Sequence, residues 1–107
     1  MRQTLFGCFE GMCHVKEEEK EDFEKYRKFP NGIAKEKVIE HIESLDPWRT
    51  SGRSRDMFTG EGLYPGIYKD GNFIFPLEFL HYYKNYDIGI PYEYEAYLKE
   101  LFEAEEG

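Results

Sequence analysis

Two cysteines and a histidine near the start of the chain have the clearest potential for metal chemistry. Cys8, Cys13 and His14 carry the thiol and imidazole groups that zinc prefers. A structural zinc site needs four such ligands at suitable spacing, and the other two histidines, His41 and His81, lie far along the chain. We therefore predict that the cysteines are core residues and that the protein binds no metal or other cofactor.

A second metal-type pair is Glu78 and His81, which would lie one turn apart on a helix. Di-iron bundles use this spacing, but they need a second such pair and two further inward-facing glutamates. The sequence offers one pair, and a helical projection places it on the outer side. The pair therefore does not change the prediction that metal ligands are absent.

Nucleophilic catalysis would need a serine or cysteine beside a positioned histidine. Ser44, Ser51 and Ser54 have no histidine close in sequence. None of them occupies the turn between a strand and a helix that exposes a catalytic serine in hydrolases. The glycines also form no phosphate-binding fingerprint. We predict no catalytic residue and no enzymatic activity, although residues distant in sequence could still come together in space.

A small basic segment interrupts the acidic chain. Arg49, Arg53 and Arg55 alternate with hydroxyl-bearing residues and glycine. Such a segment could hold a phosphate or a carboxylate. The alternative, which we prefer, is a solvated loop whose arginines pair with the protein's own acids.

The overall charge limits the classes of partner. The chain has 22 acidic and 14 basic residues, which gives a formal net charge of −8. This charge argues against nonspecific binding to nucleic acids or to anionic membranes, and it permits a basic partner. Colloidal stability alone is a sufficient alternative explanation for the acidity.

The last third of the chain is unusually rich in tyrosine, with six tyrosines between residues 82 and 97. A buried tyrosine hydroxyl needs a hydrogen-bond partner, so a small core should leave some of these side chains exposed. Exposed tyrosines beside carboxylates are typical of protein-binding surfaces. The predicted partner-binding residues are Tyr82, Tyr86, Asp87, Tyr92, Glu93 and Glu95.

The elements that would position this surface are helices and one hairpin. Apolar residues at helical spacing predict helices over residues 34–45, 76–86 and from 91 to the C-terminal region. Residues 64–75 predict a β-hairpin with Asp70 and Gly71 as its two-residue turn. That turn would pair Tyr68 with Phe73 and Ile67 with Ile74.

The remaining segments are less regular. Residues 5–15 have apolar side chains at helical spacing, although their alternation also fits a strand. Residues 16–27 predict an exposed helix with Phe23 and Tyr26 turned inward. Residues 48–62 have no periodicity and predict a long loop.

Together these elements predict one compact domain, residues 1–107, that is mainly α with one small β-hairpin (α+β). The helices can bury their apolar stripes against one another without a ligand. We therefore expect a stable monomer or small homo-oligomer. No segment approaches the roughly 20 apolar residues of a membrane span, and the N-terminus lacks the features of a signal peptide. The expected location is the cytoplasm.

Residues 58–98 contain FTGE, GIYKDGNFIFP and YYKNYDIGIPYEYEAYL. This stretch resembles the C-terminal part of small bacterial proteins that are encoded beside polymorphic or contact-dependent toxins. The resemblance implies an immunity protein that neutralises a cognate toxin domain, such as a nuclease, and it assigns no functional residue. Two alternatives remain: a phage-type inhibitor that imitates nucleic acid, and a small metal-binding protein or enzyme that uses His14, His41 or His81.

Overall fold

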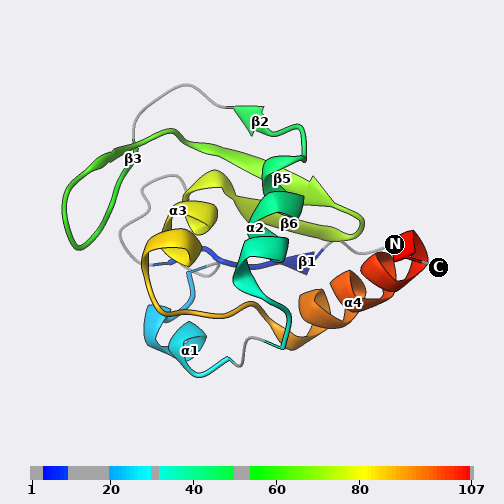
Figure 1. The fold of residues 1–107 in the computed structure, drawn as a ribbon. Helices are drawn as coiled ribbons and strands as arrows, with labels where there is room; N and C mark the ends of the chain where they lie inside the picture. The colour runs from blue at the N-terminus through cyan, green and yellow to red at the C-terminus, as the bar shows by residue number, and fades with distance from the viewer. Residues whose placement is uncertain (1–3, 10–19, 30–31, 50–53, 107) are drawn as a thin grey trace.

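The computed structural model of the chain describes residues 4–9, 20–29, 32–49 and 54–106 (Figure 1). Within these ranges the protein has an α+β fold built on a mixed four-stranded sheet in the order β1-β6-β5-β2, with a separate two-stranded ribbon of β3 and β4. The predicted class, mainly α with one hairpin, is therefore wrong. The strands are β1 (Thr4–Leu5), β2 (Trp48–Arg49), β3 (Ser54–Arg55), β4 (Gly62–Leu63), β5 (Gly66–Asp70) and β6 (Phe73–Pro76). The helices are α1 (Phe23–Arg27), α2 (Lys35–Glu43), α3 (Leu77–Asn85) and α4 (Tyr92–Glu106).

The N-terminal half differs most from the sequence-based expectation. β1 and the extended residues after it replace the first part of the helix predicted over 5–15, and the rest of that prediction lies outside the described residues. β1 pairs in parallel with β6, which agrees at Leu5 with the strand alternative for this segment. Residues 16–19 of the helix predicted over 16–27 lie outside the described residues, residues 20–22 are not helical, and residues 23–27 form α1, in which Phe23 and Tyr26 are buried as expected. The predicted loop 48–62 contains β2, β3 and the start of β4.

The three later helices are close to their predictions. α2 buries Val38 and Ile42, α3 buries Phe79 and Tyr83, and α4 buries Leu98 and Phe102. These side chains recur every three or four residues, so each helix presents one apolar stripe to the core. None of the described helices is long and apolar enough to cross a membrane.

The β5–β6 hairpin is present, but its register differs from the prediction. The turn residues are Gly71 and Asn72, so Tyr68 pairs with Phe75 and Ile67 with Pro76. Gly71 has φ +60°, and no other residue of the turn has a positive φ, which is the pattern of a type II′ turn. Asp70 stays in the strand because its buried carboxylate accepts hydrogen bonds from the Tyr94 and Tyr97 hydroxyls.

We expect replacement of Gly71 by alanine to lower the free energy of unfolding by about 1–3 kcal/mol. The positive φ disfavours a side chain, and a Cβ at this position would lie 3.0 Å from the Tyr97 ring. Urea denaturation of both proteins would measure the loss. Gly62→Ala is the matched control, because Gly62 has open space around it; equal stabilities of the two variants would contradict the assigned turn.

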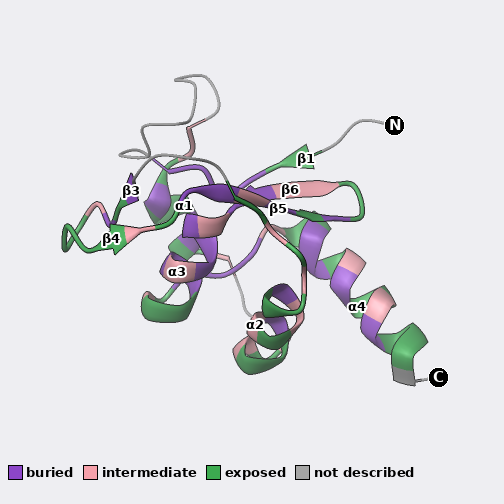
Figure 2. Ribbon diagram, turned by 90° about the horizontal axis from the view of Figure 1, so that it is seen from above, coloured by how far each residue is buried: buried purple, intermediate pink, exposed green. Residues whose placement is uncertain are grey.

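Helices α2, α3 and α4 lie on one side of the main sheet. Figure 2 shows α2, α3 and α4 below the sheet, with the opposite face of β1, β6 and β5 free of any helix that the structure describes. Phe75 of β6 packs between Phe6, Phe79 and Tyr94, which have ring centroids 4.8–5.9 Å from its own. The core is therefore the layer between this sheet face and the helices.

Candidate partner-binding face and buried aspartate clusters

A row of apolar side chains crosses the helix-free face of the main sheet. Side chains of paired residues project to the same face of a sheet. Leu5 pairs with Ile74, and Trp48 pairs with Ile67. Ile67 and Lys69 are two residues apart in β5, so their side chains project to the same face. Ile74 pairs with Lys69 and therefore lies on that face as well. Leu5, Ile74, Ile67 and Trp48 define what we call the open sheet face.

This face is accessible and slightly hollowed. The Trp48 side chain is 75% exposed and Leu5 is 39% exposed. A shallow cavity of about 360 Å³ lies between Trp48, Ile67 and Ile74, with Asp46 and Lys69 completing its wall. An exposed tryptophan next to isoleucines on a well-paired sheet is characteristic of a contact surface, because tryptophan is enriched among residues that dominate binding energy. The sequence-based prediction missed Trp48 because the residue fell in an assumed loop.

Three of the six residues predicted to bind a partner are engaged within the fold. Tyr82 is 1% exposed, and its hydroxyl accepts a hydrogen bond from the Met57 amide. Glu95 is 8% exposed, and its carboxylate accepts a hydrogen bond from the Gly32 amide. Tyr86 is half-buried and donates its hydroxyl hydrogen to Asp56. These three side chains support the structure and do not form an exposed contact surface.

The other three predicted residues, Asp87, Tyr92 and Glu93, are exposed. Tyr92 and Glu93 line a groove of about 470 Å³ at the edge of β1, together with Leu5 and Phe29. We call this the β1-edge groove. Because Leu5 belongs to both, the groove adjoins the open sheet face. Asp87 lies on the α3–α4 connection and is not part of the groove lining.

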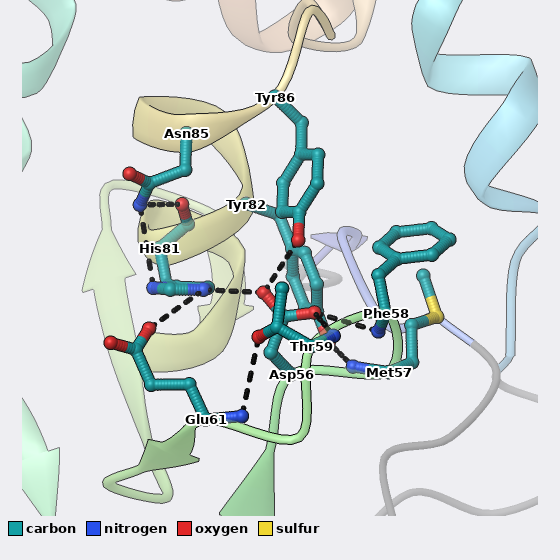
Figure 3. Close-up of polar contacts among 9 residues, drawn as sticks. All are labelled: Asp56, Met57, Phe58, Thr59, Glu61, His81, Tyr82, Asn85 and Tyr86. Atoms are coloured by element: carbon teal, nitrogen blue, oxygen red, sulfur yellow. Dashed lines mark hydrogen bonds and ion pairs between the residues drawn. The ribbon is translucent and has the colours of Figure 1, made fainter.

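A second feature is the buried carboxylate of Asp56, at the turn between β3 and β4 (Figure 3). One of its oxygens accepts hydrogen bonds from the Phe58 and Thr59 backbone amides, at 2.7 and 3.1 Å. The other lies 2.7 Å from His81 Nε2 and accepts the Tyr86 hydroxyl at 2.8 Å. Asp56 thus attaches the ribbon of β3 and β4 to α3.

Four hydrogen bonds determine the protonation state of Asp56. Burial alone would raise the pKa of Asp56, but the hydrogen bonds from His81, the Phe58 amide, Tyr86 and the Thr59 amide lower it to about 2. The same environment acts in the opposite sense on its neighbour: burial and the Asp56 carboxylate raise the pKa of Tyr86 to about 12. The ionised carboxylate and the protonated phenol therefore persist across the neutral range.

The pair of Asp56 and His81 has the composition of half a catalytic triad, in which a carboxylate orients an imidazole. The nucleophile would have to face the second ring nitrogen. At that position the structure places the amide of Asn85, with Nδ2 3.4 Å from His81 Nδ1 (Figure 3). The geometry supports a structural attachment between ribbon and helix, and it gives no positive evidence for nucleophilic catalysis.

The depressed pKa of Asp56 predicts a loss of stability in acid. A carboxyl group whose pKa is lower in the folded state contributes stability above its unfolded value, roughly 3.9. That contribution disappears as the pH falls through the folded value of about 2. We expect the stability difference between wild type and Asp56→Asn to shrink between about pH 4 and pH 2. Denaturation midpoints of both proteins across this range would measure it, and parallel curves would contradict the assignment.

Asp70 forms a similar cluster on the other side of the core. Its carboxylate lies 2.8 Å from His41 Nε2 and accepts the Tyr94 and Tyr97 hydroxyls at 2.7 and 3.1 Å. Burial, reinforced by the Asp70 charge, raises the pKa of both tyrosines. Asp70 therefore links the hairpin to α2 and α4. Neither aspartate cluster was predicted from the sequence, because each one joins residues more than 20 positions apart.

The residues considered for metal binding do not converge in the described part of the chain. Cys8 is buried, while Cys13 and His14 lie outside the described residues. His41 and His81 each face an aspartate. Within the described ranges, no group of three or more histidine, cysteine or acidic side chains is arranged to hold a metal ion.

No protein-family model matches the chain, and comparisons with curated proteins and with solved structures likewise find no match. The case for a function therefore depends on the geometry and chemistry of the surfaces described above.

Proposed function

We propose that this protein is a small cytoplasmic inhibitor of the immunity type, which binds and neutralises a cognate toxin domain through its open sheet face. The observation that carries the proposal is Trp48, which is 75% exposed at an edge of the main sheet. Covering a tryptophan of this kind removes a large apolar area from water and favours association. The half-buried Ile67 and Ile74 beside it would form the apolar centre of the contact.

The charge of the protein favours a basic toxin domain as the partner. The formal net charge of −8 would attract a cationic domain over a distance of about one Debye length and increase its association rate. The open sheet face itself carries one charge of each sign at its cavity, Asp46 and Lys69. In this proposal, apolar contact on the sheet provides most of the affinity, while the surrounding acidity steers encounter.

The β1-edge groove would extend the contact. Tyr92 is 60% exposed, and Glu93 beside it provides a carboxylate at the rim. Both residues belonged to the surface predicted from the sequence, and Leu5 connects them with the open sheet face. A partner that covers Trp48 and reaches past Leu5 would meet an aromatic side chain and an acid there.

The test is complex formation between the purified protein and the toxin domain encoded by the neighbouring gene. Size-exclusion chromatography with light scattering should show a stoichiometric complex. Raising the salt concentration should slow association more than it accelerates dissociation, because the charges act mainly on encounter. Absence of a complex at micromolar concentrations, with both proteins folded, would refute the proposed function.

A further inference from the structure

A cavity of about 300 Å³ lies between β2, α3 and the β4–β5 connection, apart from the open sheet face. Arg49 and Lys84 contribute its basic side chains, and His81 contributes an imidazole. Glu78 is the acidic residue of the lining, and it is only 1% exposed. Among the accessible side chains of the lining, basic groups therefore outnumber acidic ones, although Glu43 and Glu61 outside the lining lie 3.8 Å from Lys84 and 3.7 Å from His81. The cavity beside Trp48 and the β1-edge groove lack this excess of basic groups.

The two basic side chains can accept an anionic ligand. Lys84 Nζ lies 3.8 Å from a Glu43 carboxylate oxygen, and these side chains are 44% and 52% exposed. An exposed ion pair at this distance contributes little free energy to stability. Lys84 can therefore leave Glu43 and bind an anionic ligand at a small free-energy cost. Arg49 follows Trp48 in β2 and projects to the opposite, helix-covered face, where the cavity lies.

Tyr68 provides a third polar group in the cavity. Burial raises the pKa of its hydroxyl, and the Arg49 charge acts against that increase. The phenol therefore stays protonated at neutral pH beside the guanidinium. A protonated phenol can donate a hydrogen bond to an anion that Arg49 holds.

Apart from Asn85, the rest of the lining is apolar or aromatic. Leu63, Leu77 and Leu80 form part of the wall, and Tyr64 at the surface is 79% exposed. A cavity with a few convergent polar groups and apolar walls is typical of sites for small molecules. Its volume, about 300 Å³, suits a ligand of modest size.

We infer that this cavity binds a small organic anion, a carboxylate or phosphate monoester attached to a short aromatic or branched apolar group. Arg49 and Lys84 hold the anionic oxygens at the mouth. Tyr64 and Leu77 pack against the apolar part. This activity would be additional to partner binding, and it would persist in the isolated protein.

The experiment is a titration of the purified protein with phenyl phosphate and, separately, phenylacetate, followed by amide chemical shifts. Saturable shifts should cluster at residues of α3 and of the β4–β5 connection. Whichever of phenyl phosphate and phenylacetate has the lower dissociation constant is the preferred anion. Benzyl alcohol, a neutral analogue, should bind at least about tenfold more weakly, because a charge-assisted hydrogen bond is lost.

Variants make the inference falsifiable. Arg49→Gln should weaken binding of the preferred anion at least about tenfold. The matched control is Lys28→Gln, because Lys28 is exposed and lies outside the cavity lining. This control should change the dissociation constant by less than about twofold. Three results would overturn the inference: no saturation by either anion with the fold intact, equal binding of benzyl alcohol, or equal losses in the two variants. None of these results depends on the toxin, so the proposed function is tested separately.

Discussion

Replacing Asp70 by asparagine should lower the free energy of unfolding by about 2–4 kcal/mol and the melting temperature by about 10 °C or more. The carboxylate of Asp70 is 6% exposed and serves three donors at once: the Tyr94 and Tyr97 hydroxyls and the His41 ring. An asparagine has one acceptor oxygen, so at least one of these buried donors would face an amide NH₂ group. Chemical denaturation at neutral pH would measure the loss.

A control and a double-mutant cycle make this prediction specific. Asp87→Asn removes a charge at an exposed position and should change stability by less than about 0.5 kcal/mol. Tyr94→Phe removes one of the donors, so its effect and that of Asp70→Asn should be strongly non-additive. Simple additivity of the two effects would show that the hydroxyl and the carboxylate do not interact in the folded protein.

Trp48→Ala should weaken binding of the proposed partner, a toxin domain, by about 30-fold or more, equivalent to at least about 2 kcal/mol. The side chain is 75% exposed, so the substitution removes contact area without opening a cavity in the core. The stability of the free protein should therefore remain within about 0.5 kcal/mol of wild type. Surface plasmon resonance with the immobilised toxin domain would measure the affinity, and the change should appear mainly in the dissociation rate.

The matched control is Tyr64→Ala. Tyr64 is 79% exposed, comparable to Trp48, but it lines the basic cavity and lies outside the open sheet face. Its removal should change the affinity less than about threefold, since peripheral substitutions away from an interface have small effects. If Tyr64→Ala and Trp48→Ala had equal effects, the interface would have to be placed elsewhere.

The longer helices were predictable because their stripes are long enough to show a period. α2 and α4 repeat apolar residues over 9 and 15 positions, and their buried faces agree with the sequence pattern. Four of the strands, by contrast, are only two residues long. Two residues cannot display an alternation, so these strands depend on pairing with distant segments, such as β1 with β6.

Hydrogen bonding of the tyrosines explains why two of the tyrosines in the predicted binding surface, Tyr82 and Tyr86, are engaged within the fold. We expected that a small core could not provide hydrogen-bond partners for many tyrosine hydroxyls. The protein satisfies four of them with buried or partly buried acids: Asp70 accepts hydrogen bonds from two tyrosine hydroxyls, and Asp56 and Glu21 accept those of Tyr86 and Tyr26. The buried Tyr83 hydroxyl has no hydrogen-bond partner among the described residues. Asp70 and Asp56 lie 24 to 30 positions from the tyrosines that they bind, whereas Glu21 is five residues from Tyr26. Composition alone could not distinguish acids that satisfy tyrosines from acids at the surface.

The hairpin register was missed for a related reason. Asp-Gly is a strong turn signal, but in this chain Asp70 is required in the strand, where its carboxylate reaches α2 and α4. The turn moves by one residue, and Gly71 supplies the positive φ at its first central position. A tertiary contact thus overrides a local preference.

The proposed function is tested most directly by growth of cells that co-express the toxin domain with wild type, Trp48→Ala or Tyr64→Ala. We predict that wild type and Tyr64→Ala restore growth and that Trp48→Ala fails to do so while accumulating as a folded protein. Folding of each variant is verified by cooperative thermal unfolding of the purified protein. Failure of the wild type to protect the cells, or full protection by Trp48→Ala at matched low expression, would contradict the role assigned to the open sheet face.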